Sequence, residues 1–169
     1  MATSLRLALV GFGAIGQAVA AGLTEPGIEI VAVAVRDAAT DRPSLPESAT
    51  LISDPEELEE FEPDVVAEAA GRDSVAIWGA AALDAGADFI VSSVSAFADQ
   101  ALLESLRTKA VVRGTQLHIQ PGALAGIDAL GGARRMGIDQ VEHRMVKPCL
   151  LYTSPSPRDA TLSRMPSSA

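Results

Sequence analysis

The sequence has few aromatic residues and a single cysteine. Of its 169 residues, 4% are aromatic and 48% are hydrophobic. Any core must therefore be built mainly from Ala, Val, Leu and Ile. Cys149 has no second cysteine to pair with, which excludes an internal disulfide and a cysteine-based metal cluster. We expect no metal site.

Positive charge and long apolar runs are also scarce. Lys109 and Lys147 are the only lysines, and the formal net charge is −9. Nucleic acids and anionic membrane surfaces attract basic proteins, so this balance argues against both as partners. No apolar run reaches the roughly 18–20 residues of a membrane span, and the N-terminus has no basic-then-apolar signal pattern. These absences predict a cytoplasmic protein.

The most informative stretch is residues 5–23, where an apolar run meets closely spaced glycines. Leu5–Val10 predicts a strand, and the segment after the glycines predicts a helix. The turn between them consists of Gly11, Phe12, Gly13, Ala14, Ile15 and Gly16. The apolar face of the helix is expected to consist of Ile15, Ala18, Val19 and Leu23. A strand that turns through glycines into a helix is suited to a pyrophosphate, because the backbone comes close and the helix start offers N–H groups.

Each glycine of the turn has its own expected role. Gly11 makes the tight turn, Gly13 lets the pyrophosphate approach, and Gly16 lets the helix pack against the strand. Gly22 lies inside the helix, where we expect close packing and no ligand contact. With a second apolar strand over residues 28–35, the pattern predicts a dinucleotide cofactor, NAD or NADP, and redox chemistry.

The remaining elements predict an α/β protein. Strand-like segments at residues 64–69, 89–94 and 115–120 alternate with helical patterns. Near-continuous apolar strands between helices indicate a parallel sheet covered on both faces, so we expect a Rossmann-type doubly wound sheet. Asp54-Pro55-Glu56-Glu57 and Ser95 are expected to start helices. Behind Ser95, a buried stripe is expected from Phe97, Leu102, Leu103 and Leu106. Residues 40–50 predict a loop.

Composition divides the chain into three parts. Residues 1–120 predict a dinucleotide-binding domain, and residues 121–148 the beginning of a truncated second α+β domain that binds substrate, with a strand candidate at 141–146. Residues 149–169 contain eight Ser and Pro residues and no amphipathic period, which predicts disorder. This tail resembles adapter read-through, which predicts a gene cut near Lys147-Pro148; a natural flexible tail is the alternative.

Three further segments each follow a predicted strand, at residues 65–75, 92–99 and 120–130. They therefore lie at the carboxyl edge of the sheet, where open α/β sheets bind ligands. Small residues keep the backbone accessible there: Ala70, Gly71, Ser95, Gly122 and Ala123. We assign these loops to the cofactor and the substrate mouth.

Together with GFGAIG, these segments resemble the L-aspartate dehydrogenase family. Its pattern is a GxGAIG loop, then VVE-C/A-A-G/S, an S-V/T-x-A-x-x-D/E loop and P-S/G-G-A-I-x-x-L/I-D. The match runs over nearly all of residues 5–148. The resemblance implies an enzyme that converts L-aspartate to iminoaspartate with NAD or NADP, for oxaloacetate formation or NAD biosynthesis. It also implies a homodimer at full length.

The resemblance places Ala123 on the nicotinamide side and the catalytic histidine beyond the end of this chain. We therefore assign no catalytic residue, and we expect the fragment to be inactive. His118, in a strand expected to be buried, and His143 have no evident acid partner nearby, so both are interpreted as structural.

The choice between NAD and NADP stays open at this stage. An acid after the second strand binds a ribose 2′-hydroxyl, whereas an arginine favours a 2′-phosphate, and here Arg36 and Asp37 are adjacent. Two other functions remain: a non-catalytic dinucleotide-binding regulatory module, and a homoserine dehydrogenase-like enzyme.

Overall fold

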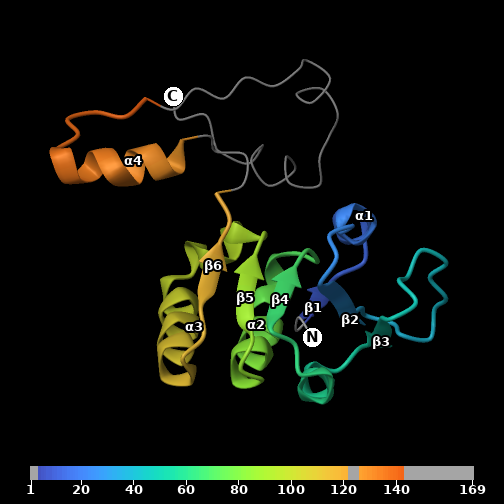
Figure 1. The fold of residues 1–169 in the computed structure, drawn as a ribbon. Helices are drawn as coiled ribbons and strands as arrows, with labels where there is room; N and C mark the ends of the chain where they lie inside the picture. The colour runs from blue at the N-terminus through green and yellow to red at the C-terminus, as the bar shows by residue number, and fades with distance from the viewer. Residues whose placement is uncertain (1–3, 122–125, 143–169) are drawn as a thin grey trace, which may run out of the picture. The chain divides into compact units, whose positions relative to one another are not determined.

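The computed structural model describes residues 4–121 and 126–142, and the chain divides into two units, Met1–Ala125 and Gly126–Ala169. In the first unit six strands form one parallel sheet in the order β3-β2-β1-β4-β5-β6 (Figure 1). The strands are β1 (Leu5–Val10), β2 (Ile28–Ala34), β3 (Thr50–Ile52), β4 (Val65–Glu68), β5 (Asp88–Val91) and β6 (Leu117–Ile119). This order is that of the dinucleotide-binding Rossmann fold, which confirms the expected fold class.

Helices cover both faces of this sheet. Helix α1 (Ala14–Gly22) packs on the face that carries Leu7 and Leu9. Helices α2 (Val75–Asp84) and α3 (Gln100–Arg113), with the 3-10 helix η1 (Pro55–Phe61), pack on the face that carries Ala8 and Val10. The alternation along β1 follows from the two-residue period of a strand. From Leu7 onward β1 is therefore buried on both faces, as its apolar sequence there predicts.

Shorter helices complete the described chain. The 3-10 helices η2 (Arg72–Ser74) and η3 (Val94–Ala98) follow β4 and β5 in the first unit. The second unit, taken by itself, contains α4 (Ile127–Ala133) and η4 (Arg134–Met136). Within residues 4–121 and 126–142, no helix is both long and apolar enough to cross a bilayer.

The apolar face expected for α1 is wrong. Ile15 is 60% exposed and Val19 36%, and Ala18 is exposed as well. The side of the helix that faces the sheet instead carries the buried Gly16, with Ala20 and Leu23 partly buried. Because Gly16 has no side chain, the helix approaches the strand on that side, and the larger apolar residues point outward.

The segment after β5 also differs from the prediction. The strand ends at Val91, and residues 94–98 form η3, so Ser95 does not cap the following helix. The cap of α3 is Asp99, whose carboxylate accepts hydrogen bonds from the N–H groups of Ala101 and Leu102. The expected stripe is confirmed: Phe97 and Leu106 are buried, and Leu102 and Leu103 pack against the same cluster.

The helix start predicted at Asp54 is confirmed. Asp54 and Glu57 form a capping box, in which the side chain of each accepts a hydrogen bond from the backbone N–H of the other. The element that follows is a 3-10 helix. The three-residue strand β3 before it was not predicted, because a single buried residue, Ile52, gives it no visible pattern. Of the strand candidate at 141–146, residues 141 and 142 are in no regular element, and residues 143–146 lie outside the described residues.

An ion-pair cluster joins α2 to α3. Asp84 accepts hydrogen bonds from Lys109 and, at 2.9 Å, from Arg113, and the Lys109 bond is the main cause that lowers the pKa of Asp84 below its ordinary value of 3.8. A lowered pKa stabilises the fold above the unfolded-state pKa, and this contribution is lost as the pH falls through the folded-state pKa.

We therefore expect Asp84→Asn to lower the free energy of unfolding by less than about 1 kcal/mol near neutral pH, since Asp84 is partly exposed. Urea titrations at about pH 7 and about pH 2.5 measure the difference, which should shrink at the acid pH as Asp84 becomes protonated. Glu104→Gln, which removes an exposed pair with Arg107, is the matched control and should have a smaller effect. An Asp84→Asn deficit that persists unchanged in acid would contradict this account.

Candidate functional site

The turn after β1 requires glycine at two positions. Gly11 has a φ of +97°, and a Cβ there would lie 2.7 Å from the Cα of Ala70. A Cβ on Gly16 would lie 2.2 Å from the carbonyl oxygen of Gly11. The N–H of Gly11 donates to the carbonyl of Ala34 at 2.8 Å, which ties the turn to the end of β2. The roles expected for these two glycines therefore have a steric cause.

Gly13 differs from them because it lies in open space. A Cβ built on Gly13 meets no atom of the described residues within 4 Å, and the backbone of Gly13 is extended at φ −78° and ψ −163°. Gly13 is the N-cap of α1, and no side chain caps this helix. Within the described chain, the N–H groups of Ala14, Ile15 and Gly16 have no hydrogen-bond partner. These free donors stand at the positive end of the helix dipole, where an anion is favoured.

The end of β4 holds a buried carboxylate that the sequence reasoning missed. Glu68 is 1% exposed, and among the described residues it is the only charged side chain that is buried. Its oxygens accept hydrogen bonds from the N–H groups of Ala70 (2.8 Å), Gly71 (2.7 Å) and Ser93 (2.9 Å). They also accept from the hydroxyls of Ser93 (3.0 Å) and Ser74 (3.3 Å). A charged residue at the end of an otherwise apolar strand was the available clue.

These bonds restrict what the β4 loop offers to a ligand. The N–H groups of Ala70 and Gly71 are committed to Glu68, so these residues can present only carbonyls and small apolar surfaces. Ser95 is exposed in η3 after the neighbouring strand. Ala123 lies outside the described residues.

Arg36 and Asp37 follow the carboxyl end of β2, and both are exposed. The Asp37 carboxylate accepts hydrogen bonds from the hydroxyl of Thr40 at 2.7 Å and the N–H of Ala39 at 3.0 Å. The Thr40 bond is the main cause that lowers the pKa of Asp37. In the described part of the chain, no hydrogen bond or ion pair holds the Arg36 side chain. Of the two side chains, only Asp37 is therefore held by its own loop.

His118 differs from its prediction in two ways. It lies on β6, the last strand of the sheet, and its side chain is 43% exposed, because an edge strand has a neighbour on only one side. It also has an acid partner, since its Nε2 lies 3.5 Å from the carboxylate of Asp88 on β5. His143 lies outside the described residues. Among residues 4–121 and 126–142, no group of three or more His, Cys, Asp or Glu could hold a metal ion.

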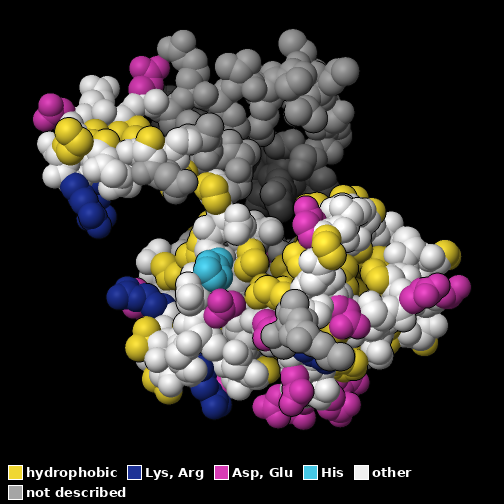
Figure 2. Space-filling model, viewed as in Figure 1, with side chains coloured by type: hydrophobic (Ala, Val, Ile, Leu, Met, Phe, Trp, Pro, Cys, Tyr) yellow, Lys and Arg dark blue, Asp and Glu magenta, His cyan; other side chains and the backbone are white. Residues whose placement is uncertain are grey.

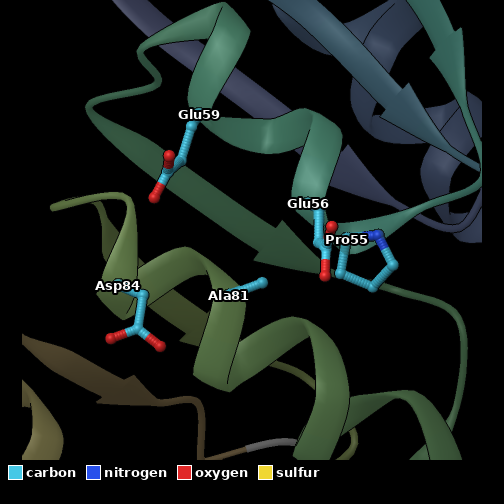
Figure 3. Close-up of a pocket in the computed structure, with 5 residues that line it drawn as sticks. All are labelled: Pro55, Glu56, Glu59, Ala81 and Asp84. Atoms are coloured by element: carbon cyan, nitrogen blue, oxygen red, sulfur yellow. The ribbon is translucent and has the colours of Figure 1, made fainter.

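A depression lies between η1 and α2, away from the glycine turn (Figure 3). Its lining consists of Pro55, Glu56, Glu59, Ala81 and Asp84. Figure 2 shows acidic side chains gathered at the lower edge of the visible face, where Figure 1 places η1. Because a dinucleotide is itself anionic, this acidic depression is unsuited to it. The free N–H groups of α1 remain the better anion site.

Comparison with known proteins agrees with this geometry. Residues 11–120, from the glycine turn to the end of β6, match the family model described as homoserine dehydrogenase, NAD binding domain. The chain belongs to this family. The matched segment includes the turn, Arg36, Glu68 and the loops after β4 and β5.

Curated relatives give a more specific likeness. The chain is 51% identical over 150 residues to an L-aspartate dehydrogenase of Brucella anthropi, a match that covers 88% of this chain and 56% of the relative. It is 38% identical to L-aspartate dehydrogenase 1 of Bordetella pertussis, over 88% of this chain and 57% of the relative. These relatives confirm the resemblance found in the motifs. The chain spans about half the length of the curated relatives it matches.

Solved structures share the fold. The aspartate dehydrogenase of Thermotoga maritima matches with a TM-score of 0.62 and 21% identity, over 78% of this chain and 52% of that one. A homoserine dehydrogenase of S. aureus matches with a TM-score of 0.56 and 23% identity, over 70% of this chain and 32% of that one. At these identities the likeness supports the fold alone.

Proposed function

We propose that this chain binds NAD or NADP and forms the cofactor-binding part of an enzyme that oxidises L-aspartate to iminoaspartate. The observation that carries the proposal is the uncapped start of α1 beside the open backbone of Gly13, inside a segment of the NAD binding family. The curated L-aspartate dehydrogenases support the substrate.

In this proposal the pyrophosphate binds at the turn formed by Gly11, Phe12, Gly13, Ala14, Ile15 and Gly16. The free N–H groups at the start of α1 donate to its oxygens, and Gly13 leaves room for them. The adenosine half then lies toward Arg36 at the end of β2, and the nicotinamide half toward Ala70, Gly71 and Ser95 at the ends of β4 and β5. Ala123 is proposed to complete the nicotinamide side.

The bound cofactor supplies the hydride acceptor for the substrate Cα, while the protein orients the two and shields them from water. We propose that the proton from the amine goes to a histidine outside this sequence, so that the chain by itself binds cofactor without turnover. We further propose a dinucleotide-binding domain over residues 1–120, the start of a substrate domain over 121–148 and a non-native tail over 149–169. For the whole protein we propose a cytoplasmic homodimer, on the resemblance and the acidic composition.

Titration of the purified 169-residue chain with NADH and with NADPH tests the cofactor proposal. We expect saturable binding of at least one of them, at one site per chain, by calorimetry or by the change in nicotinamide fluorescence. A folded chain that responds to neither would overturn it. The substrate proposal is tested with a chain extended to the length of the curated relatives, assayed with L-aspartate and with L-homoserine, with faster turnover expected for aspartate.

Arg36 provides a test of cofactor choice. Because Asp37 is held by Thr40 and Ala39, we propose that Arg36 is the side chain available to a 2′-phosphate. Arg36→Ala is expected to weaken NADPH binding about tenfold and NADH binding less than about twofold. Arg107→Ala, on the exposed surface of α3, is the matched control and should leave both unchanged. If Arg36→Ala lowered the affinity for NADH and NADPH equally, Arg36 would have no role in the choice of cofactor.

A further inference from the structure

We propose that Glu68 is a positioning residue for the nicotinamide half of the dinucleotide: its carboxylate holds together the two loops between which that half binds. The proposal rests on the proposed function, because it concerns the same cofactor. It assigns a role to a side chain that is buried.

The position of Glu68 in the sheet is the first argument. It is the last residue of β4, paired with Val10 at the end of β1 and with Val91 at the end of β5. The strand order reverses between β1 and β4, and a dinucleotide lies across that point. Since the adenosine half is assigned to β2, the nicotinamide half lies over β4 and β5. Glu68 is thus at the base of that half of the site.

The hydrogen bonds of Glu68 are the second argument. Its two oxygens accept from three backbone N–H groups and from the hydroxyl of Ser93, so both oxygens are used. Two donors belong to the loop after β4, Ala70 and Gly71, and two belong to Ser93 in the loop after β5. One side chain therefore sets the separation of two loops that are 25 residues apart in the sequence.

The partners of Glu68 show what its carboxylate does that an apolar side chain would not. Burying a carboxylate is costly unless it is hydrogen-bonded, and the hydrogen bonds of Glu68 go to the two loops. The strand ends beside it, Val10 and Val91, are apolar and fully buried. What an apolar residue at position 68 could not do is accept three backbone N–H groups from two loops. The benefit of a carboxylate here is the fixed shape of the loops.

The adenosine and pyrophosphate subsites make none of these bonds. The glycine turn has its own bond to β2, from the N–H of Gly11 to the carbonyl of Ala34. The N–H groups at the start of α1 are fixed by the helix. A change at Glu68 should therefore act on the nicotinamide half and spare the rest of the cofactor. A substitution that destabilised the whole fold would instead weaken binding of both parts of the cofactor.

Glu68→Gln in the full 169-residue chain tests the inference, because its amide keeps the size of Glu68 but turns an N–H donor toward the loop N–H groups. Affinity is measured for NADH or NADPH, whichever the unchanged chain binds, and for ADP-ribose, which lacks the nicotinamide. We expect the affinity for the dinucleotide to fall at least about tenfold and that for ADP-ribose to change less than about twofold. Glu59→Gln, an exposed carboxylate on η1, is the matched control and should change neither.

A second measurement needs no ligand. Amide hydrogen exchange at Ala70, Gly71 and Ser93 should speed up at least about tenfold in Glu68→Gln, while the amides of β1 and β2 keep their protection. Ser93→Ala, which removes one hydroxyl and keeps the backbone bonds, should lower dinucleotide affinity about two- to fivefold.

The outcomes separate the two proposals. Equal losses for ADP-ribose and dinucleotide, or unchanged loop exchange with unchanged dinucleotide affinity, would overturn the role of Glu68 and leave cofactor binding standing. An unchanged chain that binds neither ligand would overturn the proposed function, and the role of Glu68 with it.

Discussion

Gly13→Asp is expected to abolish dinucleotide binding while making the chain slightly more stable. Asp is a favoured N-cap, its carboxylate suits the positive end of α1, and within the part of the chain that the structure describes no atom lies within 4 Å of the new Cβ. The free energy of unfolding should therefore rise by about 0.3–1 kcal/mol. The same carboxylate would occupy the place of the pyrophosphate and repel it, so affinity for NADH or NADPH should fall at least about 100-fold.

Urea unfolding and cofactor titration of the same preparation measure both effects. Gly13→Asn is the matched control, because it adds nearly the same volume and a good N-cap without charge. It should retain part of the affinity that Gly13→Asp loses. If Gly13→Asp were as stable as expected and still bound dinucleotide with the original affinity, the pyrophosphate would not lie at this turn.

Gly16→Ala is expected to damage the fold itself. Its Cβ would lie 2.2 Å from the carbonyl oxygen and 3.1 Å from the carbonyl carbon of Gly11, and backbone atoms cannot turn aside as a flexible side chain can. Helix α1 must then move away from the turn. We expect the free energy of unfolding to fall by about 2–3 kcal/mol. Affinity for dinucleotide should also fall at least about tenfold, since the N–H groups of the helix start move with it.

Gly22→Ala in the same helix is the control for this change. The sequence predicted close packing at Gly22, and this was wrong, because a Cβ there meets nothing within 4 Å. The substitution should therefore leave binding unchanged and leave stability equal or up to about 1 kcal/mol higher, through the better helix propensity of alanine. A Gly16→Ala chain as stable as Gly22→Ala would contradict the steric account.

Much of the fold followed from local pattern. The strands β1 and β2 were predicted almost to the residue, because a fully buried parallel strand is a continuous apolar run. β5 was placed correctly but extended too far, because its pairing with β4 and β6 ends at Val91 and the chain bends at Ser92 before η3. β3 was missed because its pairing with β2 alone makes it a strand.

The sequence predicted the residues of the candidate site less completely than it predicted the fold. The glycine turn and Arg36 carry their chemistry in a short stretch of sequence, so they could be named from it. Glu68 could not, because its partners at Ser93 lie 25 residues away and meet it only where the ends of β4 and β5 pair. The Asp88 partner of His118 was missed for the same reason, since these two side chains are joined by the pairing of β5 with β6.

The order of apolar runs, glycines and caps was enough to define a Rossmann-type domain and a turn shaped for a pyrophosphate, because those features depend on residues near one another in the chain. Which side of α1 faces the sheet, which amides stay free for a ligand and which are taken by Glu68 were decided by tertiary structure. The physical reason is that a hydrogen bond or a steric contact between strand ends exists only after the sheet has brought those ends together.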